Sequence, residues 1–175
     1  MKSILLLLTV CSTMVGTAQE HPSPFEFKLV DSTSVLTQAQ LYSKAREWVA
    51  INFKSAKDVV QLEDATSGKI IAKGLMTSPS YGTLGLTNAV HYIKFTTTID
   101  VRPGRYRIVL SDFSNDDASN YQVRTGGSLD KPKPSAWVTK RTWEEMKSNC
   151  ARDSKALLAS FQDHMDKVEK DKDGF

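Results

Sequence analysis

The sequence predicts an α+β fold: a curved antiparallel sheet with helices on one face, in the order β-α-β-β-β-β-α. Two observations lead to this prediction. Residues 90–102 alternate apolar and polar side chains, as does a strand with one buried and one wet face. Residues 38–53 and 142–170 repeat apolar side chains every three or four positions, as amphipathic helices do. Because the strands do not alternate with helices, a doubly wound parallel sheet is excluded.

Composition limits the class of protein. The chain has 175 residues, of which 40% are hydrophobic and 25% are charged. These proportions are ordinary for a soluble globular protein and exclude a disordered chain, a collagen-like chain and a multi-span membrane protein. The formal net charge of +3 is too small to indicate nucleic acid by itself.

Residues 1–18 have the pattern of a secretory signal peptide, with cleavage expected after Ala18. Lys2 precedes the nearly continuous apolar run of residues 3–10, and small residues stand at Gly16 and Ala18. The run is far shorter than the ~20 residues that span a bilayer, so we expect no transmembrane segment in the mature chain. The expected location is periplasmic or extracellular.

Two alternatives to a cleaved signal peptide are a buried N-terminal strand and a lipoprotein modified at Cys11. Bulky Val10 and the early position of Cys11 disfavour lipidation. After cleavage only Cys150 would remain, so the fold must be held by its core and not by a disulfide. Residues 19–24 contain two prolines and predict a leader.

The first strand and helix follow this leader. Residues 25–30 begin with alternating apolar and polar side chains and predict a strand. Thr37 and Gln40 form a capping-box pattern, in which the threonine hydroxyl accepts from the third helical amide. The apolar stripe of the predicted helix consists of Leu41, Ala45, Trp48, Val49 and Phe53.

Residues 59–64 and 69–76 predict a hairpin, with Gly68 at its turn able to adopt positive φ. Gly74 is expected to mark a bulge. Residues 77–89 are rich in Ser, Thr and Gly and predict a loop, a natural gate for a groove.

In the strand at 90–102, one face is expected to be buried: His91, Ile93, Phe95, Thr97, Ile99 and Val101. Pro103 and Gly104 suit the second and third positions of a type II turn. Tyr106, Ile108 and Leu110 then point inward from the next strand.

The remaining chain predicts a loop or linker at 116–141, a helix at 142–170 and a frayed tail at 171–175. Thr142 and Glu145 form a second capping-box pattern at the helix start. The apolar stripe of this helix consists of Trp143, Met146, Cys150, Leu157, Phe161, Met165 and Val168.

Several of these segments resemble a known family. The segments are LYSKAREWVA at 41–50, FKSAKDVVQ at 53–61, ED at 63–64, GKIIAKG at 68–74 and GRYR at 104–107. Over residues 25–115 the chain resembles a small uncharacterised bacterial secreted family with a TBP-like fold, a helix-grip-like shape. The resemblance implies the fold and export. It implies no DNA binding and no catalytic residues.

No constellation of residues predicts an enzyme, a metal site or a cofactor. The histidines at 21, 91 and 164 lack metal-ligand spacing, and Cys150 has no partner cysteine. His91 is expected in the core, His164 in solvent and Cys150 in packing, with a reactive or dimer-forming thiol as the alternative. Asp112, Asp116 and Asp117 resemble calcium ligands only loosely, because their spacing departs from the EF-hand loop.

The candidate ligand-binding residues are Trp137 and the cluster Arg102, Arg105 and Arg107 beside the predicted turn. Such a patch suits an anionic lipid head group or polysaccharide, and a solvated face is the alternative. Trp137 lies among prolines and lysines, where an exposed aromatic ring can be a contact residue.

The sequence therefore predicts a non-catalytic binding or interaction module, a monomer or weak dimer, with an apolar or amphipathic ligand between sheet and helix. One alternative is an envelope-associated structural protein that assembles through Phe161, Met165 and Val168 of its last helix. Another is a hydrolase using Asp112 or His91. No nucleic-acid partner is expected.

Overall fold

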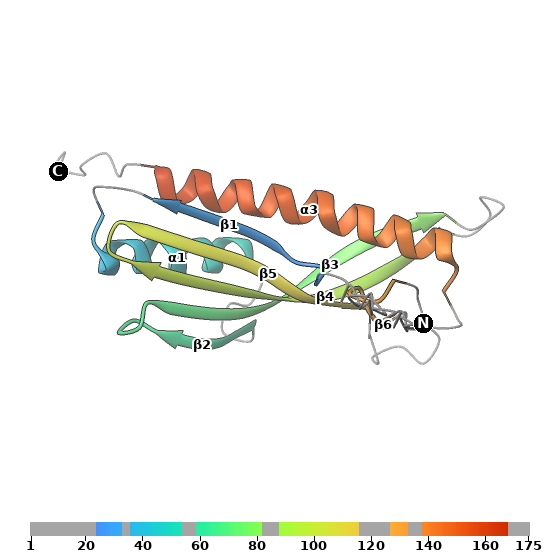
Figure 1. Cartoon of the computed structure of the whole chain (residues 1–175), viewed down its shortest axis with the longest axis horizontal. Coiled ribbons are helices and arrows are strands. Elements are labelled where there is room, and N and C mark those ends of the chain that lie inside the picture. The colour runs from blue at the N-terminus through green and yellow to red at the C-terminus, as the bar shows by residue number, and fades with distance from the viewer. Residues whose placement is uncertain are drawn as a thin grey trace, which may run out of the picture.

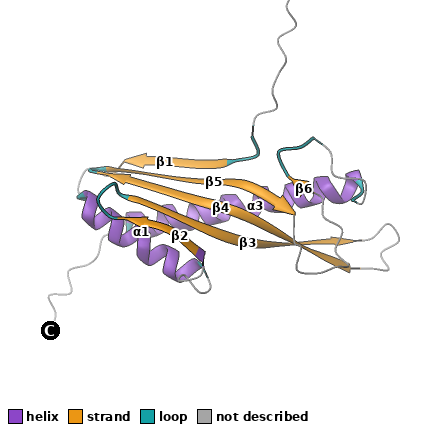
Figure 2. Cartoon of the chain, turned by 90° about the horizontal axis from the view of Figure 1, so that it is seen from below, coloured by secondary structure: helices purple, strands orange, loops and turns teal. Residues whose placement is uncertain are grey.

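The computed structural model describes residues 24–32, 36–53, 59–81, 88–115, 127–132 and 138–167. The elements in chain order are β1 (Phe27–Ser32), α1 (Gln38–Asn52), β2 (Val60–Asp64), β3 (Lys69–Tyr81), β4 (Asn88–Arg102), β5 (Arg105–Asn115), β6 (Gly127–Ser128) and α3 (Lys140–Asp166). They form the predicted antiparallel α+β fold, with both helices on one face of the sheet (Figures 1 and 2). The predicted signal peptide, with Cys11 and Ala18, lies outside the described residues.

The sheet has six strands in the order β1-β5-β4-β3-β2, and β6 pairs with β5 as well. The sixth strand was not predicted, because residues 116–141 have the composition of a loop. β6 is two residues long and pairs Gly127 with Asn115 and Ser128 with Ser114. A strand of two residues is too short to show an alternation of apolar and polar side chains in the sequence. It forms because it pairs with the last two residues of β5.

The β3–β4 hairpin is longer than predicted. Its register runs unbroken from Lys69 opposite Asp100 to Tyr81 opposite Asn88, so part of the predicted loop 77–89 is strand. One reason is a contact distant in sequence: Ser78 is buried and accepts a 2.9 Å hydrogen bond from the Asn149 amide on α3. Residues 82–87 lie outside the described part of the chain.

Gly74 does not mark a bulge, because the β3–β4 register is continuous through it. The Phe95 ring occupies the space above this glycine instead. A Cβ at position 74 would lie 2.2 Å from the ring. The glycine therefore serves side-chain packing and not backbone bending.

The two faces of β4 alternate as predicted. Residues 93, 95, 97, 99 and 101 are buried, whereas Val90, Tyr92 and Lys94 are exposed. The buried face packs against α1 and α3, and their apolar stripes complete a single core. The opposite face of the sheet, which we call the open face, carries neither of the helices in the described part of the chain (Figure 2).

α1 begins as predicted. The Thr37 hydroxyl accepts from the Gln40 amide at 3.3 Å, and the Gln40 side chain accepts from the Thr37 amide at 2.9 Å. The buried residues of this helix are Leu41, Ala45, Trp48 and Val49.

α3 begins at Lys140, two residues before the predicted start. Its N-cap is Thr139, whose hydroxyl accepts from the Thr142 amide at 3.2 Å, so the predicted cap at Thr142 is wrong. A second threonine three residues upstream satisfies the helix-start amides first.

The apolar stripe of α3 packs within the chain. Phe161 and Met165 are 0% and 1% exposed, and Phe161 lies against Trp48 and Tyr106. The alternative in which these two residues pack on a partner is therefore wrong. Val168 lies outside the described residues.

Both predicted glycine turns are confirmed: Gly68 has φ 69° and Gly104 has φ 70°. Asp64 precedes the first of these turns and accepts hydrogen bonds from the amides of Thr66 and Ser67 at 2.9 and 3.1 Å. These bonds, with one from the Ser67 hydroxyl, favour the ionised carboxylate.

We expect Asp64→Asn to lower the free energy of unfolding at neutral pH but not in strong acid. The hydrogen bonds from Ser67 and Thr66 hold the pKa of Asp64 below its ordinary value of 3.8. The carboxylate's stabilising effect is therefore fully present above that value and is lost as pH falls through the folded-state pKa. Urea unfolding of both proteins over this pH range measures it, and a difference that stays constant into strong acid would contradict it.

Candidate functional site

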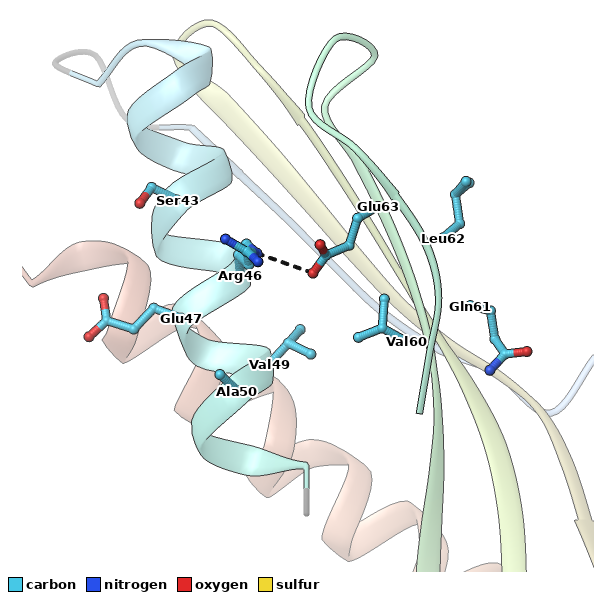
Figure 3. A pocket seen from close by; sticks show the side chains of 9 residues that line it. All are labelled: Ser43, Arg46, Glu47, Val49, Ala50, Val60, Gln61, Leu62 and Glu63. Atoms are coloured by element: carbon cyan, nitrogen blue, oxygen red, sulfur yellow. Dashed lines mark hydrogen bonds and ion pairs between the residues drawn. The ribbon is translucent and has the colours of Figure 1, made fainter. Parts of the chain in front are cut away.

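A cleft of about 700 Å³ lies between α1 and β2. Figure 3 shows the side chains that line it. Arg46 on the helix reaches across to Glu63 on the strand, with Nε 3.2 Å from Oε1. Val49 and Val60 face each other beside this ion pair. Both charged side chains are substantially exposed, and exposed pairs stabilise little. The Arg46–Glu63 ion pair spans this cleft, and its described lining residues do not form a catalytic or metal-binding group.

A second cleft, of about 780 Å³, lies between the helices and the sheet, and we call it the sheet–helix cleft. It lies beyond the paired part of β2, because the last β3 residue that pairs with β2 is Ala72, opposite Val60 at the start of β2. β3, β4, the end of α1 and the middle of α3 supply its lining: Asn52, Phe53, Leu75, Met76, Phe95, Asp153, Ala156, Leu157 and Ser160.

A third hollow, of about 280 Å³, lies on the open face at the β4–β5 turn, and we call it the basic pocket. It brings together Arg102, Arg105 and Arg107, the cluster singled out in the sequence. Trp137, the fourth predicted binding residue, lies outside the described residues.

Sequence reasoning missed two charged members of the basic pocket, Lys28 and Asp100. Lys28 lies on β1, which pairs with β5. Its position beside the arginines therefore depends on the order of strands in the sheet and not on a local sequence motif. Asp100 was identifiable as a polar residue on the outward face of the strand at 90–102. That Arg107 is its ion-pair partner could be known only from the β4–β5 register, which places the two residues opposite each other.

Cys150, His91 and His164, the candidate thiol and imidazole groups, lie where they pack within the fold. Cys150 is 1% exposed, and burial, with the nearby Asp153 charge, raises the pKa of its thiol to about 12. His91 lies on the core-facing side of β4, as predicted, and burial lowers its pKa below 6.5. His164 was expected in solvent, yet its side chain is only 17% exposed and Nε2 lies 3.8 Å from a Glu47 carboxylate oxygen. α1 and α3 meet at that point.

Asp112 occupies a β-bulge. Between Thr96–Ser111 and Lys94–Ser114, β5 has one residue more than β4, and Asp112 takes φ 55° there. Its carboxylate accepts from the Ser111 hydroxyl at 3.2 Å. Asp116 and Asp117 lie outside the described residues. Among the residues that are described, no three His, Cys, Asp or Glu side chains are grouped to hold a metal ion.

A polar cluster joins the end of α3 to the sheet. The buried Tyr106 hydroxyl lies 3.3 Å from an Asp166 oxygen and 3.4 Å from an Asp31 oxygen, to which Gln162 also donates at 2.7 Å. Burial first, and then the two carboxylates, raise the pKa of Tyr106. The phenol therefore keeps its proton and acts as a hydrogen-bond donor in this structural link.

The fold and these surfaces define the protein as an α+β protein with a TBP-like fold. The chain belongs to the family described as "Domain of unknown function (DUF4468) with TBP-like fold", whose model matches residues 27–115. The family and fold predicted from the resemblance are thereby confirmed. The family description names a fold and no activity.

Two solved structures share the architecture. A DUF4468 family protein from Bacteroides ovatus is 13% identical, with a TM-score of 0.63 over 83% of this chain and 88% of that one. A TBP-like protein from Parabacteroides distasonis is 12% identical, with a TM-score of 0.64 over 82% of this chain and 94% of that one. At these identities the likeness shows the fold alone. No curated protein matches the chain.

In the described part of the chain, neither helix combines the length and the apolar character needed to cross a membrane.

Proposed function

We propose that this protein is a non-catalytic binding module that acts after export and holds an apolar or amphipathic ligand in the sheet–helix cleft. The observation that carries the proposal is an apolar-lined hollow of about 780 Å³ between sheet and helices. Sites for small molecules commonly occupy ~300–1,000 Å³ and are lined mainly by apolar side chains.

Two phenylalanines give the cleft a firm wall. Phe53 and Phe95 are 8% and 5% exposed, and their ring centroids are 6.2 Å apart. Phe95 also stacks on Phe113, with centroids 5.6 Å apart. Met76 and Leu157 are half-buried beside this wall. The unbranched thioether of Met76 can adjust to differently shaped apolar ligands.

The polar side chains at the cleft already have partners in the protein. The Asn52 amide donates to the Trp48 carbonyl at 3.0 Å, and the Ser160 hydroxyl accepts from the Trp48 indole at 3.2 Å. Asp153 pairs with Arg152 at 2.9 Å. Burial of apolar surface is therefore the main source of affinity, at ~25 cal/mol per Å².

The lining also argues against catalysis. Among the described residues of the cleft, Asp153 is the only titratable side chain, and its partner is a cation on the same helix. Within the described lining no hydrogen bond joins Asp153 to the Ser160 hydroxyl, which accepts from the Trp48 indole instead, so no base is positioned to activate it. These residues suit holding a molecule and not transforming it.

Ala156→Phe is expected to weaken binding of a neutral apolar probe, N-phenyl-1-naphthylamine, by at least about tenfold, or ~1.4 kcal/mol. Ala156 lines the cleft from the exposed side of α3, so the added ring can occupy the ligand's space without entering the core. Probe fluorescence titrated with the folded protein gives the dissociation constant.

The matched control is Ala159→Phe. Ala159 is an exposed alanine three residues further along α3 and is not among the cleft residues. Its replacement is expected to leave the dissociation constant unchanged. Equal affinities for wild type and Ala156→Phe, or no probe binding by the wild type, would contradict the proposed function.

A further inference from the structure

Two arginines of the basic pocket face each other without a carboxylate between them. Arg102 and Arg105 are directly opposed across the β4–β5 pair and are both exposed. Like charges in directly opposed cross-strand positions are destabilising. No carboxylate of a described residue forms an ion pair with either side chain. The fold therefore holds an uncompensated positive pair at a fixed place.

The neighbouring arginine is different. Arg107 donates from Nε and Nη2 to one Asp100 oxygen, at 3.2 and 2.7 Å. This bond holds Arg107 against the sheet and neutralises it. Arg102 and Arg105 are thus the arginines available to a ligand. Arg107, bonded to Asp100, forms part of the pocket lining beside them.

The pocket is concave as well as positive. Lys28 and Val30 of β1 line its other side, and about 280 Å³ lies between them and the arginines. Four cationic side chains face one carboxylate there, that of Asp100. Val30 is 57% exposed and provides an apolar surface beside the charges. The space exceeds that of one small anion, so it accommodates part of the group to which the anion is attached.

We propose that the basic pocket binds a phosphate group carried by a larger molecule. Guanidinium forks match the oxygen geometry of phosphate, and a dianion between Arg102 and Arg105 would relieve their repulsion. Lys28 adds a third cation as a point charge. The pocket lies on the open face, opposite the sheet–helix cleft, so this proposal is independent of the proposed function.

The first test compares melting temperatures in phosphate and in chloride at matched ionic strength, so that general screening is equal. Phosphate is expected to raise the melting temperature of the wild type with concentration, as mass action requires for a ligand of the folded state. Arg102→Gln and Arg105→Gln are expected to lose this rise. In chloride each is expected to melt at or above the wild-type temperature, because the opposed charges are gone.

The matched control is Arg141→Gln. Arg141 is an exposed arginine on α3, paired with Glu145 at 2.9 Å, and it lies away from the pocket. This variant is expected to keep the full phosphate response. A second measurement needs no variant: the side-chain Nε signals of Arg102 and Arg105 in the wild-type NMR spectrum are expected to shift on addition of inorganic phosphate.

A third arm distinguishes the source of the phosphate. The wild type and both glutamine variants are sedimented with phosphatidylcholine vesicles, with and without phosphatidic acid. Arginine-dependent binding to the phosphatidic acid vesicles identifies a lipid head group. An arginine-dependent phosphate response without vesicle binding identifies a soluble phosphate ester. A phosphate response that is absent, or equal in wild type and variants, together with unshifted Nε signals, would overturn the proposal.

Discussion

Trp48→Ala is expected to lower the free energy of unfolding by about 3–5 kcal/mol, the usual cost of removing a buried aromatic ring. Trp48 is 1% exposed and makes edge contacts with Phe53 and Phe161, at centroid distances of 6.0 and 4.9 Å. Its indole also donates to Ser160 at 3.2 Å. Truncation therefore leaves a cavity where α1, α3 and the sheet meet.

Urea unfolding followed by far-UV circular dichroism measures this loss. Ile51→Ala is the matched control, because Ile51 lies on the same helix and is 67% exposed, so its truncation is expected to cost less than about 0.5 kcal/mol. Trp48→Phe keeps a ring but removes the indole donor, with an expected loss between those of the other two variants. Equal losses for Trp48→Ala and Ile51→Ala would refute this account of the core.

The sequence was most informative where local chemistry decides the structure. The cap at Thr37, the positive φ at Gly68 and Gly104, and the buried face of β4 each depend on residues a few positions apart. Local patterns fail when two candidates compete. The capping-box pattern predicts an N-cap at Thr142, but Thr139, a threonine three residues upstream, starts the helix in the structure.

The errors in β3 have tertiary causes. The polar composition after Met76 predicts a loop, but Asn149 on α3 hydrogen-bonds to Ser78 and also lies 3.3 Å from the Pro79 carbonyl. Gly74 was expected to bend its strand, but it leaves room for the Phe95 ring. In both cases the deciding contact comes from a residue at least twenty positions away in the sequence. Patterns among neighbouring residues therefore cannot reveal it.

The two candidate sites differ in how far the sequence could reveal them. A single two-residue turn brings Arg102, Arg105 and Arg107 together, so the basic pocket was visible as a local cluster. The sheet–helix cleft was expected only as a general groove. Its residues come from β3, β4, α1 and α3, and its position depends on where β2 stops pairing.

Gly68→Ala is expected to lower the free energy of unfolding by about 3 kcal/mol. The left-handed conformation at φ 69° costs a residue with a Cβ about 1–2 kcal/mol. The methyl group would also lie 2.3 Å from the Val101 carbonyl oxygen, which is backbone and cannot rotate away. Relief requires moving the turn, yet the Gly68 carbonyl accepts a 2.8 Å hydrogen bond from the Val101 amide.

Gly127→Ala separates the two causes. Gly127 also has positive φ, at 88°, but the nearest atom to an added Cβ is the flexible Lys131 Nζ at 3.7 Å. This variant is expected to lose only the conformational part, about 1–2 kcal/mol. The difference between the variants in urea unfolding then measures the collision with Val101. Equal losses would mean that the turn can move away from Val101 at little cost. The close contact between Gly68 and β4 would then not fix the position of the β2–β3 turn.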